Sequence, residues 1–325
     1  MALDVGFRTA RQISADMHAL ADANASLASI VNLGTSSGGL PLEAVKISAS
    51  RNAGRKILIL GAHHAREWIS AEVPAFTASR LVERAADPQI APLLQQAEIW
   101  IVPVVNPDGK EWSHNPQGYR LWRKNRVPIP PFAVGGVLYS NCLGVDPNRN
   151  YSYFWGQGAA STTDPRFELY QGSGAFSEAE STAIRNLATQ VQFQSAVSYH
   201  SYGQYIFHPG LPVDGQCDAA CQQRVAALAD MATAMSQAMK ASRGTDYPVF
   251  TDEAVGDTGD CAISGDCAEW LFHERGTLAV TIELPPANYD DDPTRIFVLD
   301  GDEIRPIFEE NWLGILAMLS RTLVV

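Results

Sequence analysis

A histidine and a glutamate stand three residues apart just after a short apolar segment. They are His64 and Glu67, and the apolar segment Lys56–Gly61 predicts a buried strand, at whose end α/β proteins usually bind ligands. Imidazole nitrogen and carboxylate oxygen are both good zinc ligands. The same spacing also occurs by chance on solvated helix faces, and the adjacent His63 leaves open which ring would bind.

A third potential ligand, His200, ends another apolar stretch far along the chain. Two closely spaced ligands with a distant third, and water in the fourth position, are the layout of a catalytic zinc site and not of a structural one. Taken alone, His200 fits equally well a hydrogen-bonded histidine at the end of a strand.

Cationic and amide side chains gather in a long irregular stretch between these histidines. They lie in Arg120–Arg126 and Gly144–Asn150. Guanidinium groups bind carboxylates through two parallel hydrogen bonds and stabilise developing oxyanions. The alternative for any single arginine is an ion pair with one of the many surface acids.

A carboxylate interrupts the apolar strand pattern near the C-terminus. It is Glu283, within Leu278–Leu284. Burial of an unpaired carboxylate is costly, so this side chain needs either a partner or a chemical function.

The elements that would position these residues alternate between strands and helices. Strands are predicted at Val45–Ser50, Lys56–Gly61, Glu98–Val105, Phe193–Tyr199 and Leu278–Leu284, and helices at Trp68–Arg84, Ser177–Gln190, Asp218–Arg243 and Ile304–Leu319. We expect a turn at Asn106–Gly109 and a capping box formed by Ser177 with Glu180. Because no linker or repeat divides the chain, the pattern predicts one α/β domain over residues 1–325, with helices on both faces of its sheet.

Composition excludes several classes of partner. The chain has 24 basic and 36 acidic residues, which gives a net charge of −12 and disfavours nucleic acids and anionic membranes as partners. Hydrophobic residues make up 46% of the chain and no apolar run is long enough to span a membrane, so a folded core and no membrane span are expected.

Cysteine spacing bears on the cellular compartment. Cys217 and Cys221 lie four residues apart, and Cys261 and Cys267 six apart, which leaves Cys142 unpaired. Two local disulfides would suit an oxidising compartment, although free thiols or pairing between the two clusters remain alternatives. Although no signal peptide precedes the domain, we expect a secreted monomer whose leader has been removed.

These motifs together resemble the zinc metallocarboxypeptidases of the carboxypeptidase A type, the funnelins. The resemblance is carried by His64–Trp68, Asn106–Gly109, Arg120–Lys124, Gly144–Asn150, His200–Tyr202 and Thr281–Leu284. It covers nearly the whole chain and implies a single domain with a central mixed, mostly parallel, twisted sheet.

The resemblance also implies an active site with one zinc ion. His64, Glu67 and His200 would hold the metal together with one water. Asp146 would orient His64, and Glu283 would act as general base on the zinc-bound water.

The remaining matched residues would bind the substrate, the C-terminus of a peptide or protein. Arg123 would join zinc in stabilising the tetrahedral oxyanion. Asn148 and Arg149 would hold the terminal carboxylate, which makes cleavage exopeptidic. Arg66 and Tyr202 would line subsites further from the C-terminus.

The specificity loop departs from the family pattern. An ungapped count places Cys261 where the family has a mobile tyrosine, with Tyr247 as the only other candidate nearby. The same count puts Ala268 at the base of the side-chain pocket, which favours hydrophobic or aromatic C-terminal residues. The flanking Asp266 and Glu269 keep a basic or dual specificity as the alternative.

Two other functions remain open at this point. One is a related zinc hydrolase that acts on cell-wall peptides or acyl-amino acids. The other is a binding homologue without catalysis, against which Glu283 argues, because a binding protein has no need for a general base beside the metal.

Overall fold

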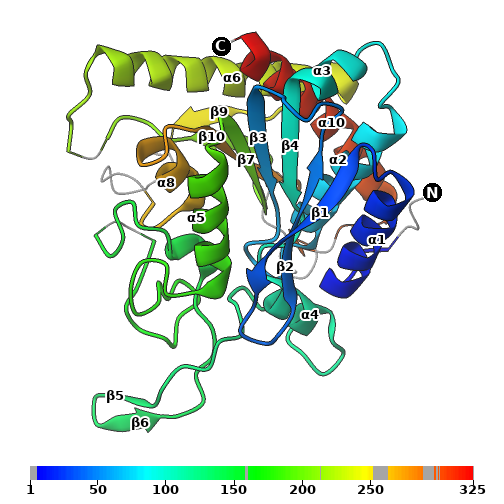
Figure 1. The fold of residues 1–325 in the computed structure, drawn as a ribbon. Coiled ribbons are helices and arrows are strands. Elements are labelled where there is room, and N and C mark those ends of the chain that lie inside the picture. Colours follow the sequence, from blue (N-terminus) through cyan, green and yellow to red (C-terminus); the bar gives the residue numbers. More distant parts are fainter. Residues whose placement is uncertain are drawn as a thin grey trace.

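An eight-stranded mixed sheet forms the centre of the computed structural model, and helices cover both of its faces (Figure 1). The structure describes residues 6–157, 160–212, 214–251, 263–287, 296–297, 299 and 301–324. The strands of this sheet are β1 (Ala28–Thr35), β2 (Pro41–Ile47), β3 (Arg55–Leu60), β4 (Ala97–Val102), β7 (Ser195–Ser201), β8 (Tyr205–His208), β9 (Val249–Thr251) and β10 (Leu278–Leu284). A separate hairpin consists of β5 (Phe132–Val134) and β6 (Val137–Tyr139).

The helices and the order of the strands complete the topology. The helices are α1 (Ala10–Ala23), α2 (Trp68–Glu83), α3 (Ala91–Gln96), α4 (Pro107–His114), α5 (Ala179–Val191), α6 (Ala219–Arg243), α8 (Cys267–His273) and α10 (Gly301–Val324), with a 3-10 turn η1 (Pro147–Arg149). The strand order is β1-β2-β4-β3-β7-β10-β8-β9. Strands β4, β3, β7 and β10 are parallel neighbours at the centre, and antiparallel pairs flank them. The mixed, mostly parallel sheet predicted from the sequence is confirmed.

The central strands are apolar on both sides because helices cover both faces. In β3, Ile57 and Ile59 belong to one hydrophobic cluster, whereas Leu58 and Leu60 belong to the other. The first cluster includes residues of α1, α2, α6 and α10, and the second includes residues of α5 and α8. A parallel strand buried in this way has a continuous apolar sequence.

Helix α2 accommodates an internal proline through its contact with β3. Proline lacks an N–H, so Pro74 leaves the carbonyl of Ser70 without its usual partner in the helix. Gly61 lies against that carbonyl, and a Cβ at Gly61 would be 2.1 Å from the Ser70 oxygen. The close approach holds the end of β3 against the start of α2, and the short segment between them carries His64 and Glu67.

Two local predictions are wrong. Asn106 does not begin a turn but caps α4, because its side chain accepts a hydrogen bond from the Gly109 N–H and Pro107 fills the first helical position. The capping box at the start of α5 is also absent: the Ser177 hydroxyl donates to Glu178, and Glu178 occupies the cap position without a side-chain cap hydrogen bond.

The cysteine prediction is half right. Cys217 and Cys221 form a disulfide at the start of α6. Cys267 is a buried free thiol, so the second predicted pair is not formed, and Cys142 is also free, as expected. Cys261 lies outside the described residues. Among the helices that the structure describes, none is both long and apolar enough to cross a membrane.

Candidate active site

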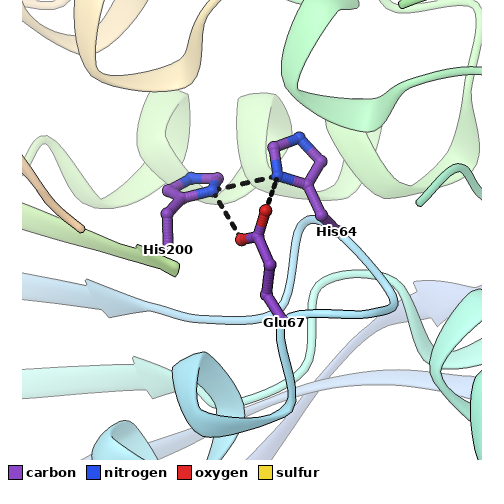
Figure 2. Close-up of side chains that lie close together, drawn as sticks. All are labelled: His64, Glu67 and His200. Atoms are coloured by element: carbon purple, nitrogen blue, oxygen red, sulfur yellow. Dashed lines mark hydrogen bonds and ion pairs between the residues drawn. The ribbon is translucent and has the colours of Figure 1, made fainter. Parts of the chain in front are cut away.

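Three buried side chains converge where the central parallel strands end (Figure 2). His64 and Glu67 lie between β3 and α2, and His200 lies in β7, the strand that pairs with β3. The Nδ1 atoms of the two histidines are 3.1 Å apart. Glu67 brings Oε1 to 2.8 Å from the His64 Nδ1 and Oε2 to 3.1 Å from the His200 Nδ1.

This donor set suits a zinc ion. All candidate ligand atoms lie within 4.8 Å of one another and all three side chains are buried. Two imidazoles and one carboxylate leave a fourth tetrahedral position open, as catalytic zinc sites require. His63, the other candidate ring, is not part of this cluster: its two ring nitrogens lie near hydroxyl groups of Ser198 and Tyr151.

A buried carboxylate, Asp146, connects the first histidine to an arginine. Asp146 accepts a hydrogen bond from the His64 Nε2 at 3.1 Å and another from the Arg123 Nε at 2.9 Å. Burial by itself raises a carboxyl pKa, but the charges of Arg123 and His64 hold the pKa of Asp146 well below its usual value. The ionised carboxylate therefore fixes both side chains. Arg123 also comes within 3.8 Å of Glu67.

Glu283 lies beside the histidines because β10 pairs with β7. In this parallel pairing Glu283 stands opposite His200. Burial raises the pKa of Glu283 to about 8, and its Oε2 is enclosed without a hydrogen-bond partner in the described part of the chain. A carboxylate with a raised pKa beside a metal site has the properties of a general base or acid.

These groups open into one cavity of about 410 Å³. Its lining includes Arg66, Arg123, Asn148, Arg149 and Tyr202, five of the residues predicted to bind substrate or stabilise the oxyanion. Asn148 and Arg149 lie in η1, next to Asp146, which caps that turn.

The backbone and an acid hold these two residues in place. The side-chain nitrogen of Asn148 donates to Asp266 at 2.7 Å, and its side-chain oxygen accepts from the Cys267 N–H at 3.0 Å. The Arg149 guanidinium donates to the carbonyls of Ala160 and Asn148. The guanidinium is thus oriented before any substrate binds.

Two of the lining residues, Arg66 and Tyr202, make an ion pair and an aromatic contact. Arg66 donates to both carboxylate oxygens of Glu168, at 3.0 and 2.9 Å. Its guanidinium lies 4.8 Å from the centre of the Phe297 ring, and Tyr202 packs edge-on against the same ring at 5.6 Å. The sequence motifs do not include Glu168 or Phe297, and neither stands in a pattern that could have singled it out.

Two predicted residues lie elsewhere. Ala268, in α8, is buried in the second hydrophobic cluster and does not line the cavity, whereas Ile263 and Asp266 are among the described residues that do. Tyr247 is fully buried and its hydroxyl donates to Glu310 at 2.5 Å, so it faces the α10 side of the core. Cys261, at the position where the family has a mobile tyrosine, lies outside the described residues.

The fold is that of an α/β protein, and its buried His–Glu–His cluster is suited to hold one metal ion. The zinc carboxypeptidase family matches residues 13–314 of the chain. The chain therefore belongs to the zinc carboxypeptidase family.

Individual relatives agree with this assignment. Carboxypeptidase A4 of Mus musculus is 31% identical over 312 residues, which are 94% of this chain and 67% of the mouse protein. Metallocarboxypeptidase A of Arthroderma otae is 32% identical over 302 residues, 89% of this chain and 65% of the fungal protein. The crystal structure of carboxypeptidase A from Helicoverpa armigera shares the fold, with a TM-score of 0.81 at 24% identity over 99% of this chain and 75% of that chain. The chain thus spans about two thirds of the length of these curated relatives.

Proposed function

We propose that the chain is a zinc-dependent exopeptidase that hydrolyses the C-terminal peptide bond of peptides and proteins. The observation that carries this proposal is the presence, in one cavity, of a buried His–Glu–His cluster, a carboxylate with a raised pKa and a fixed pair of residues for an anion. His64, Glu67 and His200 would hold the zinc, which supplies Lewis acidity and makes a water molecule more acidic.

Glu283 would be the general base. Its Oε2 has no competing hydrogen-bond partner among the described residues, so it is available to take a proton from the attacking water. The same carboxyl would then give a proton to the leaving amine. Arg123, held by Asp146, would place its guanidinium beside the oxyanion that develops on the scissile carbonyl.

Asn148 and Arg149 would decide where the chain is cut. A terminal carboxylate needs charge-assisted hydrogen bonds when it leaves water, and this pair lies in the same cavity as Glu283. An internal segment of a polypeptide has no carboxylate to offer there, so cleavage would be exopeptidic. Arg66 and Tyr202, which both contact Phe297, would contact substrate residues further from the C-terminus.

The apolar part of the cavity lining supports a preference for hydrophobic C-terminal residues. A buried acid favours the alternative, a dual specificity for hydrophobic and basic residues. Ile263 and Phe207 contribute apolar lining, whereas Asp266 contributes a carboxylate that is only 1% exposed. Asp266 accepts hydrogen bonds from Asn148 and from the first turn of α8. It could also accept one from a lysine or arginine side chain of the substrate.

The disulfide supports secretion. Disulfides persist mainly in oxidising compartments. The Cys217–Cys221 bond is therefore consistent with an extracellular enzyme.

The function is tested with blocked dipeptides that end in Phe, Leu, Lys or Arg. Zinc-loaded protein should release the C-terminal residue, and a chelator should stop the release. Release of Phe and Leu alone supports the hydrophobic preference, and release of all four supports the dual one. Equal turnover of substrates with an amidated C-terminus would refute the role of Asn148 and Arg149. No release from any of the four, with zinc bound, would refute the carboxypeptidase proposal.

A further inference from the structure

The two histidines of the metal cluster have different hydrogen-bond partners at their second ring nitrogen, Nε2. The Nε2 of His64 faces the carboxylate of Asp146. The Nε2 of His200 lies 3.1 Å from the Ser198 hydroxyl, a neutral group two residues earlier in β7. Residues that orient a ligand histidine through its second nitrogen tune metal affinity, so the two supports are not equivalent.

Beyond Ser198 the hydrogen bonds continue through the core. The Ser198 oxygen lies 3.4 Å from the Nδ1 of His63, and the Nε2 of His63 lies 3.0 Å from the Tyr151 hydroxyl. We call these three residues (Ser198, His63 and Tyr151) the hydroxyl–imidazole chain; each is at most 3% exposed.

Metal binding would fix the direction of every proton in this chain. If the Nδ1 of His200 faces the metal, its Nε2 must carry the hydrogen and donate it to the Ser198 oxygen. The Ser198 hydroxyl is then free to donate to the Nδ1 of His63. That leaves the hydrogen of His63 on Nε2, where the Tyr151 oxygen can accept it. Both imidazole N–H groups and the Ser198 hydroxyl find an acceptor in this arrangement.

Aromatic packing holds the side chains of the hydroxyl–imidazole chain in place. The rings of His63 and His200 stack at 5.4 Å with planes 16° apart, and Tyr151 packs against Trp270 at 5.5 Å. The participants come from three segments: β7, the segment between β3 and α2, and the loop after η1. The His200 ring is therefore tied to both the sheet and the layer of α8.

We propose that the hydroxyl–imidazole chain positions His200 for the metal, with His63 and Ser198 as its main members. This proposal rests on the proposed zinc site. His63 is thus assigned a positioning role next to the ligand His64. Loss of Ser198 would leave the His200 Nε2–H buried without an acceptor, because its other neighbour, the Asn148 amide nitrogen 3.5 Å away, is itself a donor. The ring would then tend to rotate away from the metal.

The test measures zinc affinity by competition with a chromophoric chelator, together with the visible spectrum of the cobalt-substituted protein. Ser198→Ala and His63→Leu should weaken zinc binding by roughly 10- to 100-fold and alter the cobalt spectrum. His63→Asn should recover part of the affinity that His63→Leu loses, because the Asn oxygen can replace the Nδ1 acceptor. Tyr151→Phe, which removes only a more distant hydroxyl, should have a smaller effect.

Tyr199→Phe is the matched control. Tyr199 is also fully buried and adjacent to His200, but its hydroxyl has no hydrogen-bond partner in the described part of the chain. This variant should keep the affinity and spectrum of the parent protein. The proposal is wrong if folded Ser198→Ala and His63→Leu proteins bind zinc as tightly as Tyr199→Phe, even if their thermal stability is lower. His200→Gln distinguishes failure of the metal site from failure of the positioning chain. Unchanged zinc affinity in that variant would refute the metal site itself.

Discussion

A buried glutamate at the start of α5 should make the stability of this protein depend on pH. Glu180, in the first turn of α5, is 1% exposed, and its Oε1 has no hydrogen-bond partner in the described chain. Its Oε2 shares the amide of Asn125 with the carboxylate of Glu178, at 3.1 and 2.7 Å. Burial raises the pKa of Glu180 from 4.5 to about 7.

The sign of the effect follows from the two pKa values. Below pH 4.5 the carboxyl is protonated in both the folded and the unfolded chain, so it carries no penalty. As the pH rises through 7 the folded protein must ionise a buried group that the unfolded chain ionises in water. The difference of about 2.5 units corresponds to roughly 3 kcal/mol of unfolding free energy, present at low pH and lost above pH 7.

Glu180→Gln removes this titration without changing the shape of the side chain. The unfolding free energy of the variant minus that of the parent should increase by about 3 kcal/mol between pH 4.5 and pH 8. Urea unfolding of the metal-free proteins, followed by tryptophan fluorescence at intervals from pH 4.5 to 8, measures this difference. Glu83→Gln, at an exposed glutamate at the end of α2, is the control and should differ from the parent by no more than about 0.5 kcal/mol. A difference between Glu180→Gln and the parent that is constant with pH would refute the reasoning.

Three further predictions concern the active site and the disulfide. Glu283→Gln should lower kcat by roughly 10²- to 10⁴-fold with unchanged zinc content by atomic absorption; loss of zinc would instead make Glu283 a ligand. Arg149→Ala should lower kcat/KM for free C-termini by roughly 10- to 100-fold, and a matching loss on amidated substrates would contradict carboxylate recognition by Asn148 and Arg149. Reduction of the denatured protein should expose two more thiols than before, from Cys217 and Cys221, in a thiol-reagent titration; no increase would exclude the disulfide.

Sequence reasoning succeeded where the signal was local. His64 and Glu67 follow a continuous apolar segment, and Glu283 interrupts one, so each could be placed at a strand before any contact was known. Strand β10 was predicted at its observed bounds for the same reason. Helix α1 gives a much weaker signal, because its buried positions Ile13 and Met17 form a narrow stripe among polar residues.

The parts that sequence missed depend on contacts between distant segments. Ser177 and Glu180 have the spacing of a capping box, but Asn125, more than fifty residues away, takes the Glu180 carboxylate. The ungapped count that placed Ala268 in the pocket could not show that α8 turns this residue into the core and leaves Asp266 facing the cavity. No local pattern could have shown either arrangement.

The charge of the cavity links metal binding to substrate capture. Three arginines and three carboxylates line it, namely Arg66, Arg123 and Arg149 with Glu67, Asp266 and Glu283. When Glu283 is ionised these formal charges balance, and Glu168 also pairs with Arg66. In a protein with a net charge of −12, the arginines alone therefore provide little attraction for an anionic peptide terminus. A divalent ion would be the largest local charge and would make the cavity cationic, so recognition of a terminal carboxylate should depend on zinc as well as on Arg149.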